Sequence, residues 1–324
     1  MILPTKVMMK KIRNQINGLL LLDKPLGLSS NRAIQRVKWI LNAEKVGHTG
    51  TLDPLATGLL PVCLGEATKF ANYLLDGDKE YFATAQLGIV TDSGDSEGKL
   101  VANNPVNTNL NAIQEALQHF TGAISQIPPM YSALKHNGRP LYEYAREGIE
   151  IERKVRHVII HELELVEYKA DLQQIIFRAK ASKGTYIRSL AEDIGNLLGC
   201  GASLVALRRT QTNQFSLSNA CSLEDLENIT DLSELNLLSP AILCEQLSAY
   251  SITAEQYSAI KFGNPVHLDE LPLNSTLEEE VRIYAGEHFL GVATITQRYE
   301  RLWLAPKRII SGLAVFDPWI EKIL

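Results

Sequence analysis

The sequence is poor in the features that mark disulfide-rich, zinc-binding or membrane-spanning proteins. It has four cysteines in 324 residues, and no two of them form a C-x-x-C pair. This scarcity argues against a zinc knuckle and against a disulfide framework, and it is typical of buried, reduced thiols. No apolar run approaches the length that crosses a bilayer, and the N-terminal stretch has no signal-peptide core. We therefore expect a cytoplasmic protein without a membrane anchor.

Common phosphate-binding loops and an overall basic charge are also missing. Neither G-x-G-x-x-G nor G-x-x-x-x-G-K-[ST] occurs, so the sequence does not indicate a dinucleotide or nucleoside triphosphate site. The 32 basic residues are outnumbered by 37 acidic ones, which gives a net charge of −5 and argues weakly against a nucleic-acid binder. Any surface that binds phosphates must then be a local cluster of cations.

What is present is the composition of an ordinary folded protein. Hydrophobic residues make up 45% of the chain and charged residues 21%, and the length suits two domains with a substantial core. Strand and helix patterns are mixed without a regular βαβ alternation, which indicates an α+β fold. Short strands after about residue 250 predict a small all-β module of about 75 residues, with an acidic net charge.

Local patterns predict the elements in more detail. Helical spacing of apolar residues predicts helices within 29–43 and 110–120, another that ends at Gly148, and one that follows the SKGTY turn. Apolar or alternating runs predict strands near 18–24, 155–168 and 174–181, and from Tyr81 to about Val90. Turn-forming residues predict a loop at 47–58, and residues 222–250 read as helical or looped.

The segment GHTGTLDPLATGLLPVCLGEATK, residues 47–69, places a single carboxylate, Asp53, in a glycine-flanked turn. Four interpretations compete for this acid. It caps a turn, as Asp often does, or it belongs to a phosphate-binding loop, for which the motif is missing. It binds a metal, for which His48 is the only other ligand nearby, or it is a lone catalytic carboxylate that acts as a nucleophile. Residue chemistry alone leaves these alternatives open.

Six segments, taken together and in order, resemble the bacterial tRNA pseudouridine-55 synthases, the TruB family. They are LLLDKPLGLSS, GHTGTLDPLATGLLPVCLGEATKF, DKEY, PPMYSALKHNGRPLYEYAREG, SKGTYIRSLAEDIG and LRRTQTNQF. The resemblance is dense from about residue 18 to 217. It implies a pseudouridine synthase catalytic domain over 1–249, with a mixed, largely antiparallel central sheet flanked by helices and loops. It implies a small PUA-like β-barrel domain over 250–324 that binds RNA or supports the catalytic domain.

The resemblance also implies an activity, the isomerisation of uridine 55 in the tRNA T-loop to pseudouridine. The N1–C1′ bond breaks, the uracil turns while it stays bound, and C5 joins C1′. Because the product is an isomer, no cofactor and no metal is expected. The expected partner is tRNA, bound through its T-arm by a monomer without a protein partner. Two alternatives are a non-catalytic tRNA-binding or tRNA-folding protein and a guide-RNA-dependent pseudouridine synthase, a group that usually carries long basic tails.

By this resemblance Asp53 is the catalytic carboxylate, because rearrangement at an anomeric carbon needs an ionised acid near C1′. Tyr81, in DKEY, is expected to stack on the target base. Arg188, in GTYIRSL, is expected to pair with Asp53, and a guanidinium beside a carboxyl favours the ionised form of that carboxyl.

Further residues are expected to hold the RNA. Tyr186 and Leu207 are expected to line the uracil site, and His48 to fill the space that a flipped-out uridine leaves in the RNA. A local basic surface is expected from residues in the same motifs. These residues are Lys69, Lys135, His136, Arg139, Arg146, Lys183, Arg208 and Arg209, with Lys307 and Arg308 in the C-terminal module.

Overall fold

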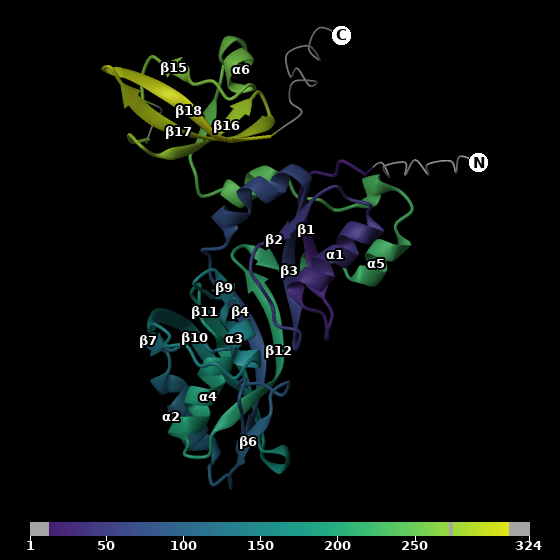
Figure 1. Ribbon diagram of the computed structural model, residues 1–324, viewed down its shortest axis with the longest axis vertical. Coiled ribbons are helices and arrows are strands. Elements are labelled where there is room, and N and C mark those ends of the chain that lie inside the picture. Colours follow the sequence, from purple (N-terminus) through teal and green to yellow (C-terminus); the bar gives the residue numbers. More distant parts are fainter. Residues whose placement is uncertain (1–12, 272–274, 311–324) are drawn as a thin grey trace, which may run out of the picture.

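The computed structural model describes residues 13–271 and 275–310, and it confirms the expected α+β architecture (Figure 1). The outer parts of the two expected domains, residues 1–12 and 311–324, lie outside the described residues, as do residues 272–274. A larger N-terminal part contains the central sheet, and a smaller β-rich part follows at the C-terminal end (Figure 1).

The central sheet is mixed and largely antiparallel, as expected. Its main path runs β1-β3-β12-β4-β11-β10-β7, with β2 paired to β3 and β13 paired to β12, and the β3–β12 pair is its parallel one. The strands of this sheet are β1 (Gly18–Lys24), β2 (Val46–His48), β3 (Ala56–Leu64), β4 (Lys79–Leu87), β7 (Gly122–Gln126), β10 (Arg156–Lys169), β11 (Gln174–Ala181), β12 (Ala202–Thr212) and β13 (Phe215–Ser216).

Strand β12 lies in the middle of the sheet and brings distant parts of the chain together. Leu207 of β12 pairs with Ala56 of β3 on one side and with Ala83 of β4 on the other. The segments around residues 50, 80 and 207 therefore meet at one place, although more than a hundred residues separate the last from the others.

Two predicted boundaries were wrong. The loop expected at 47–58 is shorter, because β2 extends to His48 and β3 begins at Ala56. The strand expected from Tyr81 to about Val90 starts two residues earlier and ends at Leu87. Gly88 follows with φ +82°, a left-handed conformation that glycine adopts readily and that turns the chain.

Helices α2 and α4 pack on the part of the sheet formed by β10 and β12, and α1 and α5 lie together near β1 and β2 (Figure 1). Helix α1 forms as expected, because the Ser29 hydroxyl caps its first turn while Ala33, Ile34 and Val37 face the core. The helices of the larger part are α1 (Ser30–Ile40), α2 (Leu110–His119), α3 (Leu141–Arg146), α4 (Ile187–Leu197) and α5 (Leu223–Asn228), with the 3-10 segments η1 (Gly65–Leu74), η2 (Ala170–Leu172), η3 (Leu217–Asn219), η4 (Leu232–Glu234) and η5 (Pro240–Cys244).

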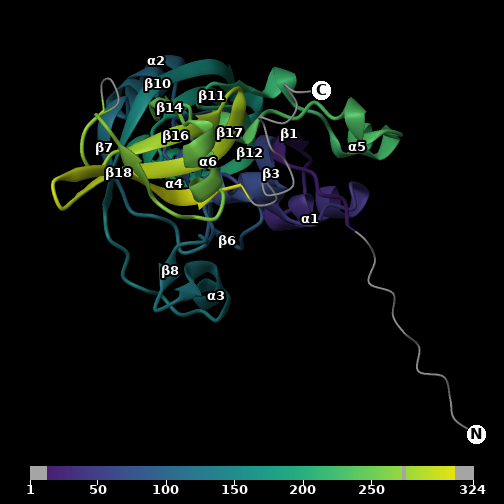
Figure 2. The same cartoon turned by 90° about the horizontal axis from the view of Figure 1, so that it is seen from above.

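Two excursions leave the sheet. One is the hairpin of β5 (Ile89–Thr91) and β6 (Leu100–Asn103). The other is an arm formed by β8 (Lys135–His136), β9 (Arg139–Pro140) and α3, which stands away from the rest of the molecule (Figure 2). Gly148 follows α3 with φ +72°, so this helix ends where the sequence predicts.

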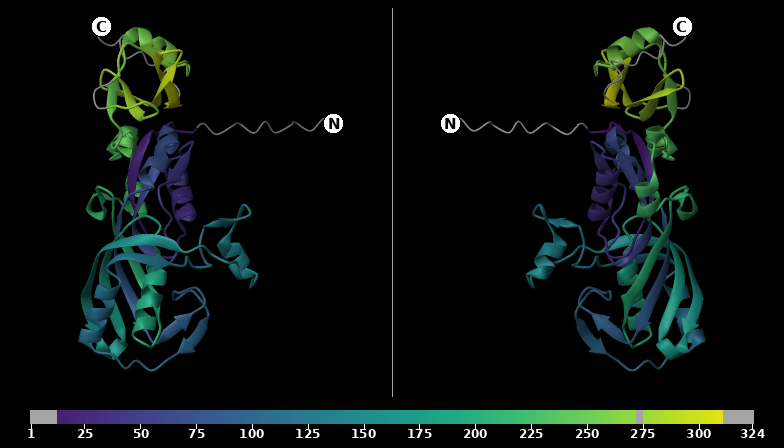
Figure 3. Two further views of the ribbon diagram at one scale, coloured as in Figure 1. Left: turned by 90° about the vertical axis from the view of Figure 1, so that its left-hand side faces the viewer. Right: turned by 90° about the vertical axis from the view of Figure 1, so that its right-hand side faces the viewer.

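The C-terminal module is a curled sheet in the order β14-β16-β17-β18-β15, but it is not all β as expected (Figure 3). Helix α6 interrupts it, and its start is stabilised by a capping box between Thr253 and Gln256. Its elements are β14 (Ala249–Ser251), α6 (Ala254–Ile260), β15 (Val266–Leu268), β16 (Glu280–Ala285), β17 (His288–Arg298) and β18 (Arg301–Ile309).

The module shares a hydrophobic core with the larger N-terminal part. Phe289 and Val292 of β17 pack in one cluster with Phe70 of η1 and Leu243 of η5, and the two phenylalanine rings meet edge to face at 5.2 Å. The Lys69 ammonium donates to the carbonyl of Ile309 at 2.8 Å across the same junction. The two parts therefore stabilise each other through burial of apolar surface as well as through polar contacts.

Candidate active site

Asp53 lies in the short loop between β2 and β3, and this loop is anchored to α1. The buried hydroxyl of Ser30 donates to the carbonyl of Leu52 at 3.0 Å and accepts from the Leu52 amide at 2.7 Å. A second anchor is the turn after β1, where the Gly27 amide donates to the carbonyl of Pro54 at 2.9 Å. Both neighbours of Asp53 are thus fixed, which holds the Asp53 backbone beside the start of α1.

Arg209 holds the same loop through hydrogen bonds to backbone carbonyls. Its guanidinium donates to the carbonyls of Leu59 at 2.7 Å and Gly50 at 3.2 Å, and its side chain is buried. Gly58 is required at this contact, because a Cβ there would lie 2.3 Å from the Arg209 carbonyl oxygen and its φ is +100°. The expectation that Arg209 contributes to a positive surface was therefore wrong, because its guanidinium is buried and donates to backbone carbonyls.

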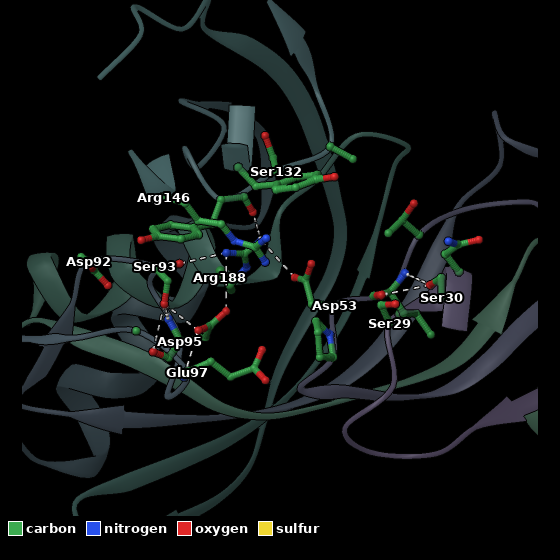
Figure 4. Close-up of a pocket in the computed structure, with 18 of the residues that line it drawn as sticks. Ser29, Ser30, Asp53, Asp92, Ser93, Asp95, Glu97, Ser132, Arg146 and Arg188 are labelled. Atoms are coloured by element: carbon green, nitrogen blue, oxygen red, sulfur yellow. Dashed lines mark hydrogen bonds and ion pairs between the residues drawn. The ribbon is translucent and has the colours of Figure 1, made fainter. Parts of the chain in front are cut away.

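Arg188, in the first turn of α4, reaches Asp53 from the other side of the site (Figure 4). Its guanidinium lies 3.0 Å from the Asp53 carboxylate and 3.5 Å from that of Asp95. It also donates to the carbonyls of Ser93 at 2.9 Å and Tyr131 at 2.7 Å. Only 4% of the Arg188 side chain is exposed, against 38% for Asp53, so a fixed cation faces an acid that remains open to the cleft.

Asp95 is a member of the site that the sequence motifs did not reveal. Its carboxylate accepts from the Ser93 hydroxyl at 2.6 Å and from the Glu97 amide at 3.1 Å, which holds it beside Arg188. The loop TDSGDSEG contains three acids at turn-forming positions, and nothing in their spacing distinguishes the one that points inward. Asp95 is therefore recognisable as a partner of Arg188 only in the folded chain.

The local electrostatics act on Asp53 in opposite directions. Burial in the cleft raises the pKa of the Asp53 carboxyl above its ordinary value, and the Arg188 guanidinium counteracts this rise. Lys24 is also near: burial lowers the pKa of its ammonium to about 8, and the charge of Asp53 opposes that shift. The Lys24 ammonium donates to the carbonyls of Pro25 and Leu28, which shapes the turn that anchors the Asp53 loop.

Asp53 opens into a cavity of about 320 Å³ that is lined by aromatic and aliphatic side chains together with the cations Lys79, Arg188 and Arg209. Tyr81 of β4 and Leu207 of β12 form part of the lining, and both are nearly buried. Tyr186 precedes α4, and its amide and carbonyl are both hydrogen-bonded to the side-chain amide of Gln126. Asp53, Tyr81, Tyr186, Arg188 and Leu207, which are far apart in the sequence, thus surround one space of the size that ligand pockets have.

His48 lines a wider cavity, of about 740 Å³, on the other side of Asp53. Burial lowers the pKa of the His48 imidazole, and the nearby Arg209 lowers it further, so the ring is neutral near pH 7. A neutral ring suits the expected packing role better than a phosphate contact. Asp53 and Arg188 line both cavities, so they stand where the two spaces meet.

Half of the residues expected in the basic surface are paired with acids in the free protein. Arg208 pairs with Asp23, and Lys183 pairs with Asp76 at 2.9 Å. Lys69 lies apart from Asp53, at the junction with the C-terminal module, where it pairs with Glu66. Lys307 pairs with Glu280, and Arg139 pairs with Glu143 and Glu147 in the arm. Arg146 lies over the ring of Tyr142, and Lys135 is exposed.

Neither a cluster of metal ligands nor a membrane-crossing helix is found in the described residues. Within 13–271 and 275–310 there is no group of three His, Cys, Asp or Glu side chains arranged to hold a metal ion. Among the helices of that same part of the chain, none has the length and apolar character that a bilayer crossing requires.

Comparison with known proteins finds relatives for most of the chain. Residues 38–187 match the model of the N-terminal domain of TruB family pseudouridylate synthases, and residues 188–243 match that of the tRNA pseudouridylate synthase B C-terminal domain. The tRNA pseudouridine synthase B of Francisella philomiragia is 49% identical and covers 88% of this chain and 93% of its own length. That of Chromobacterium violaceum is 51% identical and covers 80% of this chain and 84% of its own.

Solved structures share the fold at lower identity. A chain in the structure of an H/ACA RNP bound to a substrate RNA containing 2′-deoxyuridine aligns with a TM-score of 0.67 and 24% identity, over 91% of this chain and 85% of that one. A chain of a Cbf5-Nop10-Gar1 complex aligns with a TM-score of 0.67 and 25% identity, over 90% of this chain and 84% of that one. These alignments extend over most of the chain, so the likeness covers the overall architecture as well as the central sheet.

Proposed function

Because the chain belongs to the TruB family of pseudouridylate synthases, we propose that it isomerises uridine 55 in the T-loop of tRNA, with Asp53 as the catalytic carboxylate. The chain is an isomerase of the pseudouridine synthase class. The observation that carries the choice of site is the Asp53 carboxylate, held at 3.0 Å from Arg188 at the edge of the cavity lined by Tyr81, Tyr186 and Leu207.

The geometry suits a reaction that rearranges one nucleotide without a co-reactant. The N1–C1′ bond breaks and a C5–C1′ bond forms, while the proton lost from C5 is balanced by one gained at N1. Attack of a carboxylate on C1′ and removal of the C2′ proton are two routes, and each requires Asp53 in its ionised form. Arg188 stabilises that form in a site from which the bound nucleotide excludes water.

The aromatic and apolar side chains of the smaller cavity suit a uracil that turns while it stays bound. Tyr81 and Tyr186 offer aromatic rings and Leu207 an apolar contact, against which the base can pack as it turns. A T-loop uridine must first leave the RNA stack, and the neutral ring of His48 lies next to the same acid to fill the gap. Binding through the T-arm, action as a monomer without a protein partner, and a cytoplasmic location belong to the same proposal.

The direct test is to map pseudouridine along an unmodified tRNA transcript after incubation with the protein. We expect conversion at uridine 55, and no conversion in a matched transcript that carries cytidine at that position. Conversion confined to other positions would reject the proposed site. A protein that binds the transcript but converts no uridine would be the non-catalytic alternative.

We also expect activity to be independent of divalent metal ions. The isomerisation consumes nothing, and the proposed chemistry needs only the side chains that surround Asp53. The measurement is turnover of a T-arm hairpin before and after dialysis against a chelator, because full tRNA needs magnesium for its own folding. Loss of turnover that a divalent ion restores on the hairpin would contradict this expectation.

A further inference from the structure

Helix α1 carries basic and aromatic side chains on an exposed face that borders α5. Arg32, Gln35, Arg36 and Trp39 are all exposed, and their spacing places them on one side of the helix. Trp39 is 67% exposed, an unusual position for so large an apolar ring. The sequence of α1, SNRAIQRVKWI, contains no acidic residue. We call these four residues the outer face of α1.

The cations on this face are only weakly engaged within the protein. Arg32 forms no ion pair with any residue that the structure describes. Arg36 pairs with Glu227 of α5, and its guanidinium also lies over the Trp39 ring at 4.7 Å from the ring centre. Both partners of that ion pair are nearly half exposed, and exposed pairs of this kind are weak and exchange readily for other anions.

Helix α1 begins at the wall of the cleft that contains Asp53, and the residues of its outer face follow along the helix. Ser29, Ser30 and Asn31, at the start of α1, line the wider cavity, and Tyr142 and Arg146 of α3 line it as well. The arm that carries α3 projects from the side of the body on which α1 lies (Figure 3). A ligand that enters the cleft between α1 and α3 would therefore also pass along one of these two helices.

We propose that the outer face of α1 binds the phosphate backbone of the substrate RNA stem next to the uridine that reacts. Arg32 and Arg36 bind phosphates, and the Trp39 ring packs against a ribose or an unpaired base. The face spans about 10 Å along the helix, enough to contact neighbouring phosphates on a strand. This inference rests on the proposed function, because it assumes that RNA occupies the cleft.

Charge and position favour RNA over a protein partner on this face. The whole chain has a net charge of −5, so attraction of phosphates requires a local cation cluster. The sequence of α1 places Arg32 and Arg36 close together with no acid between them, although Glu227 of α5 pairs with Arg36. A guanidinium stacked on an indole can still donate in its own plane, which is how arginine contacts phosphate oxygens. A substrate uridine inserted beside Asp53 also brings its flanking phosphates to the rim that α1 forms.

The test compares wild-type protein with the double variant Arg32→Gln/Arg36→Gln on a T-arm hairpin and on full tRNA. We expect Kd and KM to rise about tenfold while kcat stays within about twofold. The slope of log Kd against log salt should fall by roughly 0.7 to 0.9 for each phosphate that the variant no longer binds. Lys169→Gln, which alters the charge at the end of β10 toward the opposite edge of the sheet, should change none of these values. An unchanged Kd and salt slope in the double variant would overturn the inference.

Glu227→Gln separates RNA binding from a structural role of Arg36. If Arg36 binds phosphate, removal of the Glu227 charge leaves the cation in place, and RNA affinity stays the same or increases. If Arg36 only joins α1 to α5, Glu227→Gln should reproduce the weaker binding of Arg36→Gln, and the inference fails. Thermal unfolding of each variant shows whether the fold is retained.

Trp39→Ala gives a further readout, because an uncharged ring contributes to RNA affinity without releasing counterions from the phosphates. We expect a severalfold rise in Kd with an unchanged salt slope, and recovery in Trp39→Phe. Equal affinity of Trp39→Ala and wild type would remove Trp39 from the RNA-binding surface. These assays measure binding, whereas the proposed function is judged by pseudouridine formation in wild-type protein. The two claims can therefore fail separately.

Discussion

Replacing Asp53 with asparagine is expected to abolish turnover and to leave tRNA binding nearly unchanged. The amide has almost the shape of the carboxylate but can neither attack C1′ nor accept a proton from C2′. Loss of an essential catalytic group reduces kcat by a factor on the order of 10⁴ or more. The measurement is single-turnover pseudouridine formation on a T-arm hairpin, together with Kd for the same RNA.

The structure makes this substitution a clean test. The backbone of the loop is fixed by Ser30 at Leu52 and by Gly27 at Pro54, so the loop should keep its course without the charge at Asp53. The asparagine also removes an attractive partner of Arg188, whose guanidinium keeps Asp95 and two carbonyls. Asp171→Asn in η2 is the matched control and should retain full turnover. Retained turnover in Asp53→Asn would reject the catalytic role, and a joint loss of binding and turnover would favour a structural cap.

Replacing Arg188 is expected to have the second-largest effect, through the charge of Asp53. In Arg188→Gln the buried guanidinium that opposes the rise of the Asp53 pKa is gone, so that pKa should rise further. Because the ionised acid is the active form, the acid limb of the pH–rate profile should move to higher pH. Arg188→Lys keeps a charge but cannot bridge Asp53, Asp95 and two carbonyls, so we expect a loss of about 10²- to 10³-fold.

Stability should depend on pH in the corresponding direction. A carboxyl whose folded-state pKa is raised lowers stability once it ionises, so its cost is absent well below its ordinary pKa and complete above the raised one. Without Arg188 the cost of ionising Asp53 is larger, and the buried Asp95 also loses its ion-pair partner. The free energy of unfolding of Arg188→Gln should fall below that of wild type by roughly 3 to 5 kcal/mol near neutral pH, and the gap should narrow in acid. A constant gap, with an unmoved acid limb, would show that Arg188 acts only as a structural brace.

Much of the fold could be predicted because its signals are local. The Ser29 cap with Ala33, Ile34 and Val37 predicts α1, and Gly148 predicts the end of α3, where it has φ +72°. Strands β3 and β12 were not recognised. Gly58 and Pro61 lie within β3, and both are unfavourable in an ordinary strand, while Arg208 and Arg209 give β12 a polar pattern. Pairing with neighbours, which no local window contains, overrides those preferences.

The candidate site, like the fold, could be predicted only in part. The residues Asp53, Tyr81, Tyr186, Arg188 and Leu207 could be chosen from the sequence because their motifs match a known family, and their assembly around one cavity was then found in the structure. The place of Asp95 in the site and the burial of Arg209 could not be predicted. The sequence does not distinguish a charged side chain that points inward from one that is exposed. Local sequence specifies the residue types and the turns of this protein. Which charges are bound by partners and which face the cleft depends on the folded chain, because burial and distance are set when β3, β4 and β12 come together.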